Sequence, residues 1–301
     1  MQILITGGTG MIGRALCQRW QLAGHALTVV SRSPDQVAAL CSGARGIAAL
    51  SQLESDYRPD VVVNLAGAPI ADRPWSARRK RLLWESRIMA TQALVQWMAD
   101  LPAPAPVLLS ASAVGWYGDT GEQPVDESAA VPGHDFGAQL CAAWELAALQ
   151  ATQSGSRVVI VRIAPVLAAQ GGMLARLLLP FRLGLGGRLG HGRQWMPWIH
   201  LDDLLAMFDH LLAHTDSSGI YNGCAPTPVR NAEFTRVLAA QLHRPAILPA
   251  PAWLLRGLLG EMSVLLLGGQ RAQPVRTAAA GFHFRYASLE QALQQLLPSS
   301  S

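Results

Sequence analysis

A run of glycines near the N-terminus has the spacing of a phosphate-binding turn. In the stretch Thr6–Gly13 they stand three residues apart, between a short apolar segment and a helical one. Gly7 allows a tight turn, Gly10 lets the backbone approach a diphosphate, and Gly13 lets the helix pack close to the strand. The helix N-terminus then offers N–H donors and a positive dipole. The residues expected to contact the diphosphate of a dinucleotide are Gly7, Thr9, Gly10, Met11, Ile12 and Gly13.

The end of the second apolar segment discriminates between the two nicotinamide dinucleotides. A site for NAD(H) usually carries an Asp or Glu there, which accepts from the ribose 2′-hydroxyl. This chain has Ser31 and Arg32 and no acid. A guanidinium cannot accept from a hydroxyl, but it pairs well with a 2′-phosphate. The sequence therefore favours NADP(H) as the cofactor.

The composition is that of a well-buried protein. Half of the 301 residues are hydrophobic and 15% are charged. Mean hydropathy is +0.21, but the most apolar region, 245–269, is interrupted by prolines and charges, and a spanning helix needs about 20 apolar residues. The chain starts directly on a strand-like segment. We therefore expect a cytoplasmic protein without a membrane partner.

Cysteines and basic residues exclude other classes of site. Four scattered cysteines without a Cys-x-x-Cys pair argue against zinc and disulfides, so no metal is expected. The net charge is +4, and the basic residues are almost all arginine, because Lys80 is the only lysine. The cluster Arg78–Arg81 lacks the aromatic residues of a nucleic-acid stripe and is interpreted as a solvated helix face.

The first half alternates strands with helices. The strands are continuous apolar runs, as in a parallel sheet that is covered on both faces. We predict an α/β fold: a Rossmann-type doubly wound parallel sheet with a smaller C-terminal α/β substrate lobe. The cofactor domain spans 1–170, with returns at about 196–225, and the lobe spans 171–301. Expected strands are 3–6, 27–31, 60–65, 107–110, 158–162 and 219–222; expected helices are 11–23, from about 34, 76–98, 137–151, 203–213, 231–242 and 288–297. Asn231 is expected to cap the helix 231–242.

Several further motifs follow in a fixed order. They are Asn64-Leu65-Ala66-Gly67, Ser110-Ala111-Ser112-Ala113 with Trp116-Tyr117-Gly118-Asp119, and Trp198-Ile199-His200-Leu201-Asp202-Asp203-Leu204. With the glycine turn, they resemble the extended short-chain dehydrogenase/reductase superfamily. The segments PFRLGLGG at 180–187 and GGQRAQP at 268–274 make the whole chain similar to a narrower group. These are atypical, epimerase-like proteins that end in a small domain of unknown function.

The resemblance implies roles for individual residues. Leu65, Ala66 and Gly67 line the adenine and ribose side of the cofactor, Arg87 approaches it, and the backbone at Val166 covers the nicotinamide. Ser112 matches the serine that hydrogen-bonds a substrate carbonyl or hydroxyl, beyond the end of a strand. Tyr117 follows in a turn that reaches the same crevice, one residue further from the serine than in typical epimerases. Ser112 and Tyr117 are the predicted catalytic residues.

The family's Tyr-x-x-x-Lys pair is absent from this chain. Counting back from Glu145 puts Gly137 at the tyrosine position and Cys141 at the lysine position. Other proton carriers near this helix are His134 and Asp135, although Asp135 is expected to cap it. His200 with Asp202 forms another candidate pair. We expect structural roles for this pair, with Asp202 as a helix cap, and Cys141 as an inert core residue.

Two functions remain open from the sequence. In the first, the chain is an NADP(H)-dependent oxidoreductase or epimerase that acts on a small polar or nucleotide-linked substrate. In the second, it binds NADP(H) without catalysis and regulates a partner. For an anionic substrate, the glycine-rich lobe offers arginines and tryptophans: Arg182, Arg188, Arg193, Trp195 and Trp198. The alternative for these residues is a structural loop.

Overall fold

The computed structural model describes residues 1–101 and 107–298 and contains a parallel sheet of seven strands. Its spatial order is β11-β7-β5-β4-β1-β2-β3. The strands are β1 (Gln2–Thr6), β2 (Ala26–Val30), β3 (Arg45–Ile47), β4 (Val61–Asn64), β5 (Val107–Ala113), β7 (Arg157–Ile163) and β11 (Gly219–Gly223). This is the predicted doubly wound Rossmann-type sheet. The sequence missed β3, because three residues without an apolar run give no strand signal.

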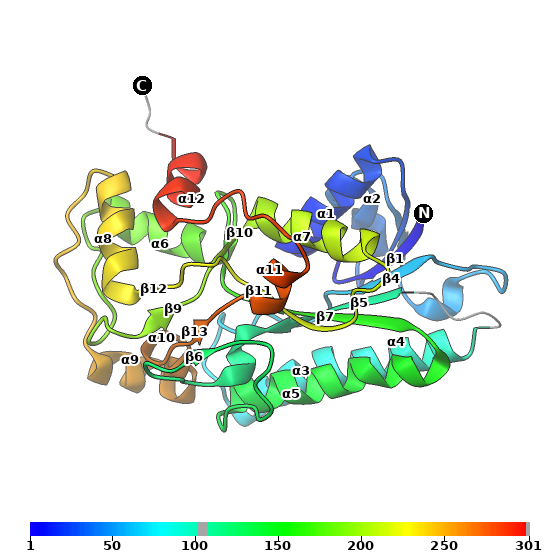
Figure 1. Ribbon diagram of the computed structural model, residues 1–301, viewed down its shortest axis with the longest axis horizontal. Coiled ribbons are helices and arrows are strands. Elements are labelled where there is room, and N and C mark those ends of the chain that lie inside the picture. The colour runs from blue at the N-terminus through cyan, green and yellow to red at the C-terminus, as the bar shows by residue number, and fades with distance from the viewer. Residues whose placement is uncertain (102–106, 299–301) are drawn as a thin grey trace.

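Helices cover both faces of the sheet, as Figure 1 shows. One face packs against α1 (Met11–Leu22) and α7 (Leu201–Ala213) through side chains such as Leu16 and Phe208. The other packs against α4 (Ala90–Ala99) and α5 (Phe136–Leu149). Alternate residues of each strand therefore enter different cores, which explains why the strands are apolar throughout.

The expected helix 76–98 is one continuous rod with a change of pitch. Ser76 caps α3 (Ala77–Trp84) by accepting from the Arg79 N–H, a π-helical segment follows over Glu85–Met89, and α4 continues from it. A π-helical turn widens the helix by one residue and is common at functional sites. Here it carries Arg87. The short second helix is α2 (Val37–Leu40), after a 3-10 turn at Pro34–Gln36.

Of three cap assignments, one is confirmed and two are wrong. Asp135 caps α5 by accepting from the Ala138 N–H at 3.0 Å, as expected. The cap of α7 is His200, whose Nδ1 accepts from the N–H of Asp202. Asn231 lies inside α8 (Asn231–Gln241), and its side chain accepts from the Leu189 N–H instead.

The C-terminal lobe lies at the end of the sheet where the strands finish, on the left of Figure 1. Its own core contains Trp198, Phe234 and Leu293. The division of the chain at residue 170 stays a prediction. The lobe's helices are α6 (Gly172–Arg182), α8, α9 (Ala252–Leu259), α10 (Val264–Leu267), α11 (Val275–Ala279) and α12 (Leu289–Leu296), and its short ladders pair β8 (Val166–Leu167) with β10 (Ile199–His200), β9 (Trp195–Met196) with β12 (Val229–Arg230), and β6 (Pro124–Val125) with β13 (Arg271–Ala272).

Candidate functional site

The strand order reverses between β1 and β4. From β1 the chain proceeds to β2 and β3 on one side, and then crosses to β4, β5, β7 and β11 on the other. In open α/β sheets, the crevice at such a switch point, outside the carboxyl ends of the strands, is where ligands bind. The glycine turn follows β1 and the segment Leu65–Gly67 follows β4, so both predicted cofactor segments meet at this crevice.

The glycine turn is shaped by close backbone contacts. Gly7 has φ +73°, and a Cβ there would lie 2.4 Å from the carbonyl oxygen of Leu65. A Cβ on Gly13 would lie 2.6 Å from the carbonyl oxygens of Gly7 and Gly8. Gly10 donates its N–H to the Gly7 carbonyl at 3.1 Å and caps α1. Positions 7 and 13 thus admit only glycine, while Gly10 is exposed at the helix N-terminus.

Arg87 lies beneath the segment that follows β4. A Cβ on Gly67 would be 2.9 Å from the guanidinium carbon, so the two are packed together. The guanidinium stacks 5.2 Å from the ring of Trp144 and makes no ion pair with any carboxylate in the described residues. Burial lowers its pKa. A cation without a counter-charge in a ligand crevice fits an anionic ligand.

The segment around Val166 reaches the crevice from the lobe side. Val166 is buried on β8. Its carbonyl oxygen would be 2.9 Å from a Cβ on Gly172, and the sulfur of Met11 would be 3.1 Å from one on Gly171. The structure therefore brings Val166 close to Met11 at the start of α1.

Ser31 and Arg32, which follow β2, differ in their contacts within the protein. Ser31 accepts from the N–H of Ser33 at 3.1 Å and donates its own N–H to Ile47. Arg32 is exposed, and no other residue in 1–101 or 107–298 forms an ion pair with it. The other exposed arginine nearby, Arg14, donates from Nε to the carbonyl of Thr9 at 2.7 Å.

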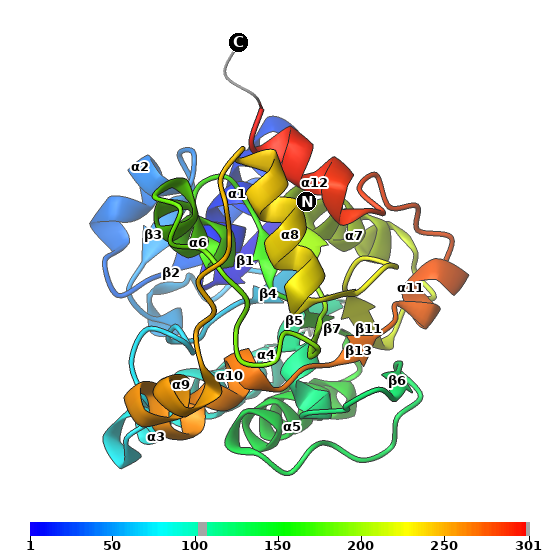
Figure 2. The same ribbon diagram turned by 90° about the vertical axis from the view of Figure 1, so that its left-hand side faces the viewer.

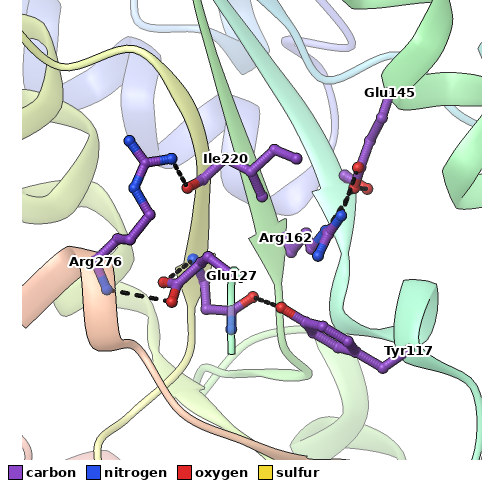
Figure 3. Close-up of polar contacts among 8 residues, drawn as sticks. Tyr117, Glu127, Glu145, Arg162, Ile220 and Arg276 are labelled. Carbon is purple, nitrogen blue, oxygen red and sulfur yellow. Dashed lines mark hydrogen bonds and ion pairs between the residues drawn. The ribbon is translucent and has the colours of Figure 1, made fainter. Parts of the chain in front are cut away.

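Ser112 belongs to a buried polar network at the carboxyl end of β5. The strand continues to Ala113, so Ser112 lies inside it, whereas the sequence predicted a position beyond its end. Its hydroxyl donates to Glu145 Oε1 at 2.6 Å, and Arg162 binds both oxygens of that carboxylate, each at 2.8 Å. All three side chains are at most 5% exposed. Figure 3 shows Arg162 on β7 facing Glu145 on α5. The guanidinium also stacks 3.5 Å from the ring of Trp116.

This network limits what Ser112 can do. A hydroxyl has one proton and two acceptor lone pairs. Since the proton points to Glu145, Ser112 can only accept a hydrogen bond from a ligand. It therefore suits a substrate hydroxyl or N–H group better than a carbonyl oxygen. The two-fold contact with Arg162 occupies both oxygens of the Glu145 carboxylate and holds it in place.

The Tyr117 hydroxyl is committed to a second network. It donates to Asn222 Oδ1 at 2.9 Å, as Figure 3 shows. The N–H of Asn222 donates to Glu127, whose other oxygen accepts from the N–H of Arg276. Burial raises the pKa of Tyr117 to about 12. The phenol is therefore neutral at physiological pH, and its catalytic assignment stays a prediction.

Helix α5 offers no proton carrier at the family positions. Gly137 has no side chain, and the thiol of Cys141 is buried, which raises its pKa to about 12. Asp135 is occupied as the helix cap, and His134 is exposed. The structural interpretation of Cys141 is therefore supported by its burial.

The lobe residues divide into exposed and buried ones. Arg182, Arg188 and Arg193 are exposed. Trp195 is half-buried between the guanidinium groups of Arg230 and Arg271, at 4.6 and 4.8 Å. Trp198 was expected to stack on a ligand, but it is fully buried and donates from Nε1 to the carbonyl of Thr227 at 3.1 Å.

Several site residues escaped the sequence analysis. Glu145 served there only to count positions, and its partner Arg162 lies on the next strand. Asn222 and Glu127 gave no motif at all. A buried acid and a buried arginine at the ends of adjacent elements are the signal that could have revealed the first pair, because such charges need partners.

Comparison with known proteins gives the family. The profile described as "NAD dependent epimerase/dehydratase family" matches residues 3–224, and a domain of unknown function, DUF1731, matches residues 250–296. Epimerase family protein Mb2239 of Mycobacterium bovis is 41% identical, with 97% of this chain and 96% of the relative covered. Human epimerase family protein SDR39U1 is 35% identical over 99% of this chain and 100% of the relative.

Solved structures agree with this result. Human SDR39U1 (isoform 2), crystallised with NADPH, superposes with a TM-score of 0.88 at 33% identity, and both chains are covered completely. UDP-glucuronic acid 4-epimerase from Bacillus cereus, with UDP-glucuronic acid and NAD, has a TM-score of 0.79 at 16% identity, covering 98% of this chain and 97% of that chain, and shows the fold alone. The chain therefore belongs to the NAD dependent epimerase/dehydratase family, among the atypical extended short-chain dehydrogenases/reductases that end in DUF1731.

Proposed function

We propose that this protein binds NADP(H) at the β1/β4 switch point and acts as an oxidoreductase or epimerase on a small polar or nucleotide-linked substrate. The observation that carries the proposal is the Arg87 guanidinium, which is packed against Gly67 and has no carboxylate partner within residues 1–101 and 107–298. The human relative was crystallised with NADPH. The bound cofactor would supply or accept the hydride.

Each predicted residue has a role in this arrangement. The N–H groups at the start of α1 would bind the diphosphate, and Gly7 and Gly13 keep that turn compact. Arg32, beside Ser31, would hold the 2′-phosphate. The residues Leu65, Ala66, Gly67 and Arg87 would line the adenosine side, and the backbone at Val166 would cover the nicotinamide.

On the substrate side, the polar side chains of the protein would orient the substrate and would not exchange protons with it. Ser112 Oγ would accept a hydrogen bond from a substrate hydroxyl, held in place by Glu145. The Tyr117 hydroxyl uses its proton in the hydrogen bond that it donates to Asn222. A proton that leaves the substrate would therefore find no acceptor in the hydroxyl groups of Ser112 and Tyr117.

The second candidate is a non-catalytic NADP(H)-binding regulatory protein. A specific observation favours it: Gly137 and the buried Cys141 replace the proton carriers on α5, and the hydroxyl protons of Ser112 and Tyr117 both point to protein acceptors. Such a site could hold the cofactor without a reaction.

Titration and turnover separate the two candidates. NADPH fluorescence should report saturable binding at micromolar concentrations; if neither NADPH nor NADP⁺ binds, both candidates fail. NADPH oxidation is then followed with small hydroxylated aldehydes and ketones, NADP⁺ reduction with the corresponding alcohols, and interconversion of isomers with UDP-sugars. For an enzyme, Ser112→Ala should lower turnover by about ten-fold, the value of one hydrogen bond, with unchanged NADPH affinity. Binding without turnover across the panel supports the regulatory candidate.

A further inference from the structure

The C-terminal lobe exposes an unusual number of large apolar side chains around α9. Ile247 is 78% exposed, Trp253 73% and Leu258 66%. Leu183, Leu185, Leu248 and Leu254 are exposed as well. Single exposed apolar residues are normal on a protein surface, whereas contiguous groups mark an interaction site.

These residues lie on segments that run side by side. The N–H of Leu248 donates to the carbonyl of Gly186 at 3.3 Å, and the N–H of Ala250 donates to that of Arg188 at 2.9 Å. Figure 2 views this side of the lobe and shows the chain between α8 and α9 descending next to the loop after α6. We call the surface formed by residues 182–188, 244–249 and 253–258 the arginine–leucine face.

Helix α9 turns its apolar residues outward. None of its eight residues is buried, and Leu255 and Leu259, four residues apart, are the half-buried leucines that face the protein. Trp253, Leu254 and Leu258 are exposed together with Arg256. A helix in water normally presents the opposite arrangement.

Positive charge predominates on this face, and the exposed carboxylates Glu233 and Glu261 lie just outside its segments. No Asp or Glu occurs in residues 171–200 or 234–260. No ion pair with a carboxylate in the described part of the chain neutralises the exposed arginines. Two of them, Arg188 and Arg236, border a groove of about 490 Å³ whose walls include Ala246, Ile247 and Pro249. The exposed arginines of the face and its groove are Arg182, Arg188, Arg236, Arg244 and Arg256.

The combination of exposed apolar side chains and exposed arginines distinguishes between possible binding partners. A second copy of the chain would place arginines against arginines, at a cost in repulsion. A nucleic acid would satisfy the arginines but leave Ile247, Leu248 and Leu258 without apolar neighbours. An anionic bilayer satisfies both, because its headgroups bind guanidinium groups while Trp and Leu side chains enter the interface.

We propose that the arginine–leucine face docks on the surface of an anionic lipid bilayer. The expectation of no membrane partner rested on the lack of a spanning segment, and within the described residues no helix is long and apolar enough to cross a bilayer. Docking on the surface needs no such helix. The proposal is independent of whether the crevice performs a reaction.

Sedimentation with lipid vesicles tests the proposal on the full-length protein. We expect binding to vesicles of equal parts phosphatidylglycerol and phosphatidylcholine, weaker binding at high salt, and no binding to phosphatidylcholine alone. Each arginine near the surface contributes roughly five-fold to partitioning, so Arg188→Ser with Arg236→Ser should weaken it by roughly 25-fold. Leu258→Gln should also weaken it.

Leu22→Gln is the matched control, because Leu22 is 84% exposed on α1, outside the face. NADPH titration and circular dichroism check that each variant is folded. Failure to bind anionic vesicles, or equal binding by the Leu258→Gln and Leu22→Gln variants, overturns the proposal. A concentration-dependent dimer in light scattering that Leu258→Gln abolishes also overturns it, in favour of a second copy as the occupant.

Discussion

Replacing Gly10 with alanine separates cofactor binding from folding. Gly10 has φ −74° and ψ 171°, an extended conformation that alanine adopts without strain. An added Cβ would have a single close neighbour, the carbonyl oxygen of Gly7 at 3.3 Å. The lower freedom of the unfolded chain with alanine offsets this tight contact and the poorer N-cap, so we expect the free energy of unfolding to change by no more than about 1 kcal/mol.

Cofactor affinity should fall. Gly10 is exposed at the N-terminus of α1, where the diphosphate is expected. A methyl group in that position must displace either the phosphates or the turn. Forcing one carbon into a packed contact costs about 1–3 kcal/mol. The Kd for NADPH should therefore rise by roughly 5- to 150-fold.

The assay is a fluorescence titration with NADPH beside urea unfolding of the same preparation. Gly257→Ala is the control, because its Cβ would meet nothing within 4 Å and it lies on α9; it should leave NADPH affinity unchanged. If Gly10→Ala binds NADPH as tightly as the parent protein, the diphosphate does not lie over this turn and the reasoning is refuted.

Three further outcomes follow from the same contacts. Arg32→Ala should weaken NADPH by about ten-fold and leave NADH unchanged in parallel titrations, because only NADPH carries the 2′-phosphate; equal losses would contradict this. Glu145→Ala leaves the guanidinium of Arg162 buried without its carboxylate, so urea denaturation should show that the free energy of unfolding falls by about 3–5 kcal/mol. A fall of less than about 1 kcal/mol would show that the pair is not buried in solution. Burial raises the pKa of Tyr117 to about 12, against an ordinary value of 10, so the unfolded chain loses this proton first as the pH rises. The free energy of unfolding should therefore fall between pH 10 and 12, and Tyr117→Phe should remove that part of the fall.

Local patterns predicted the sheet and the cofactor turn well. Each apolar run between turn residues is a strand in the structure, because a strand that is buried on both faces is apolar at consecutive residues and can be located in the sequence. The glycine turn was equally readable, because contacts of 2.4–2.6 Å to a neighbouring backbone allow no side chain at Gly7 and Gly13. The predicted sites for Arg32 and Arg87 stay predictions, although both guanidinium groups lack carboxylate partners in the described structure.

Assignments that depended on distant partners could not be made from the sequence. His200 became the cap of α7 while its Nε2 contacts Gln295, 95 residues away. Asn231 looked like a cap, but the loop that contains Leu189 takes its side-chain oxygen. Trp198 was a candidate for stacking on a ligand ring because it follows the glycine-rich loop, yet its ring is buried in the core of the lobe.

The absence of the Tyr–Lys pair and the presence of the Glu145–Arg162 pair have to be explained together. A buried ion pair is often no more stabilising than an apolar pair, so its stability alone does not account for it. Here the carboxylate orients the Ser112 hydroxyl, and the guanidinium supports the ring of Trp116. In the proposed substrate site, the pair would hold the Ser112 wall of the crevice in a geometry that accepts hydrogen bonds and donates none. A reaction at this wall suits a substrate that arrives with its own donor, and a carbonyl compound without one should bind poorly there.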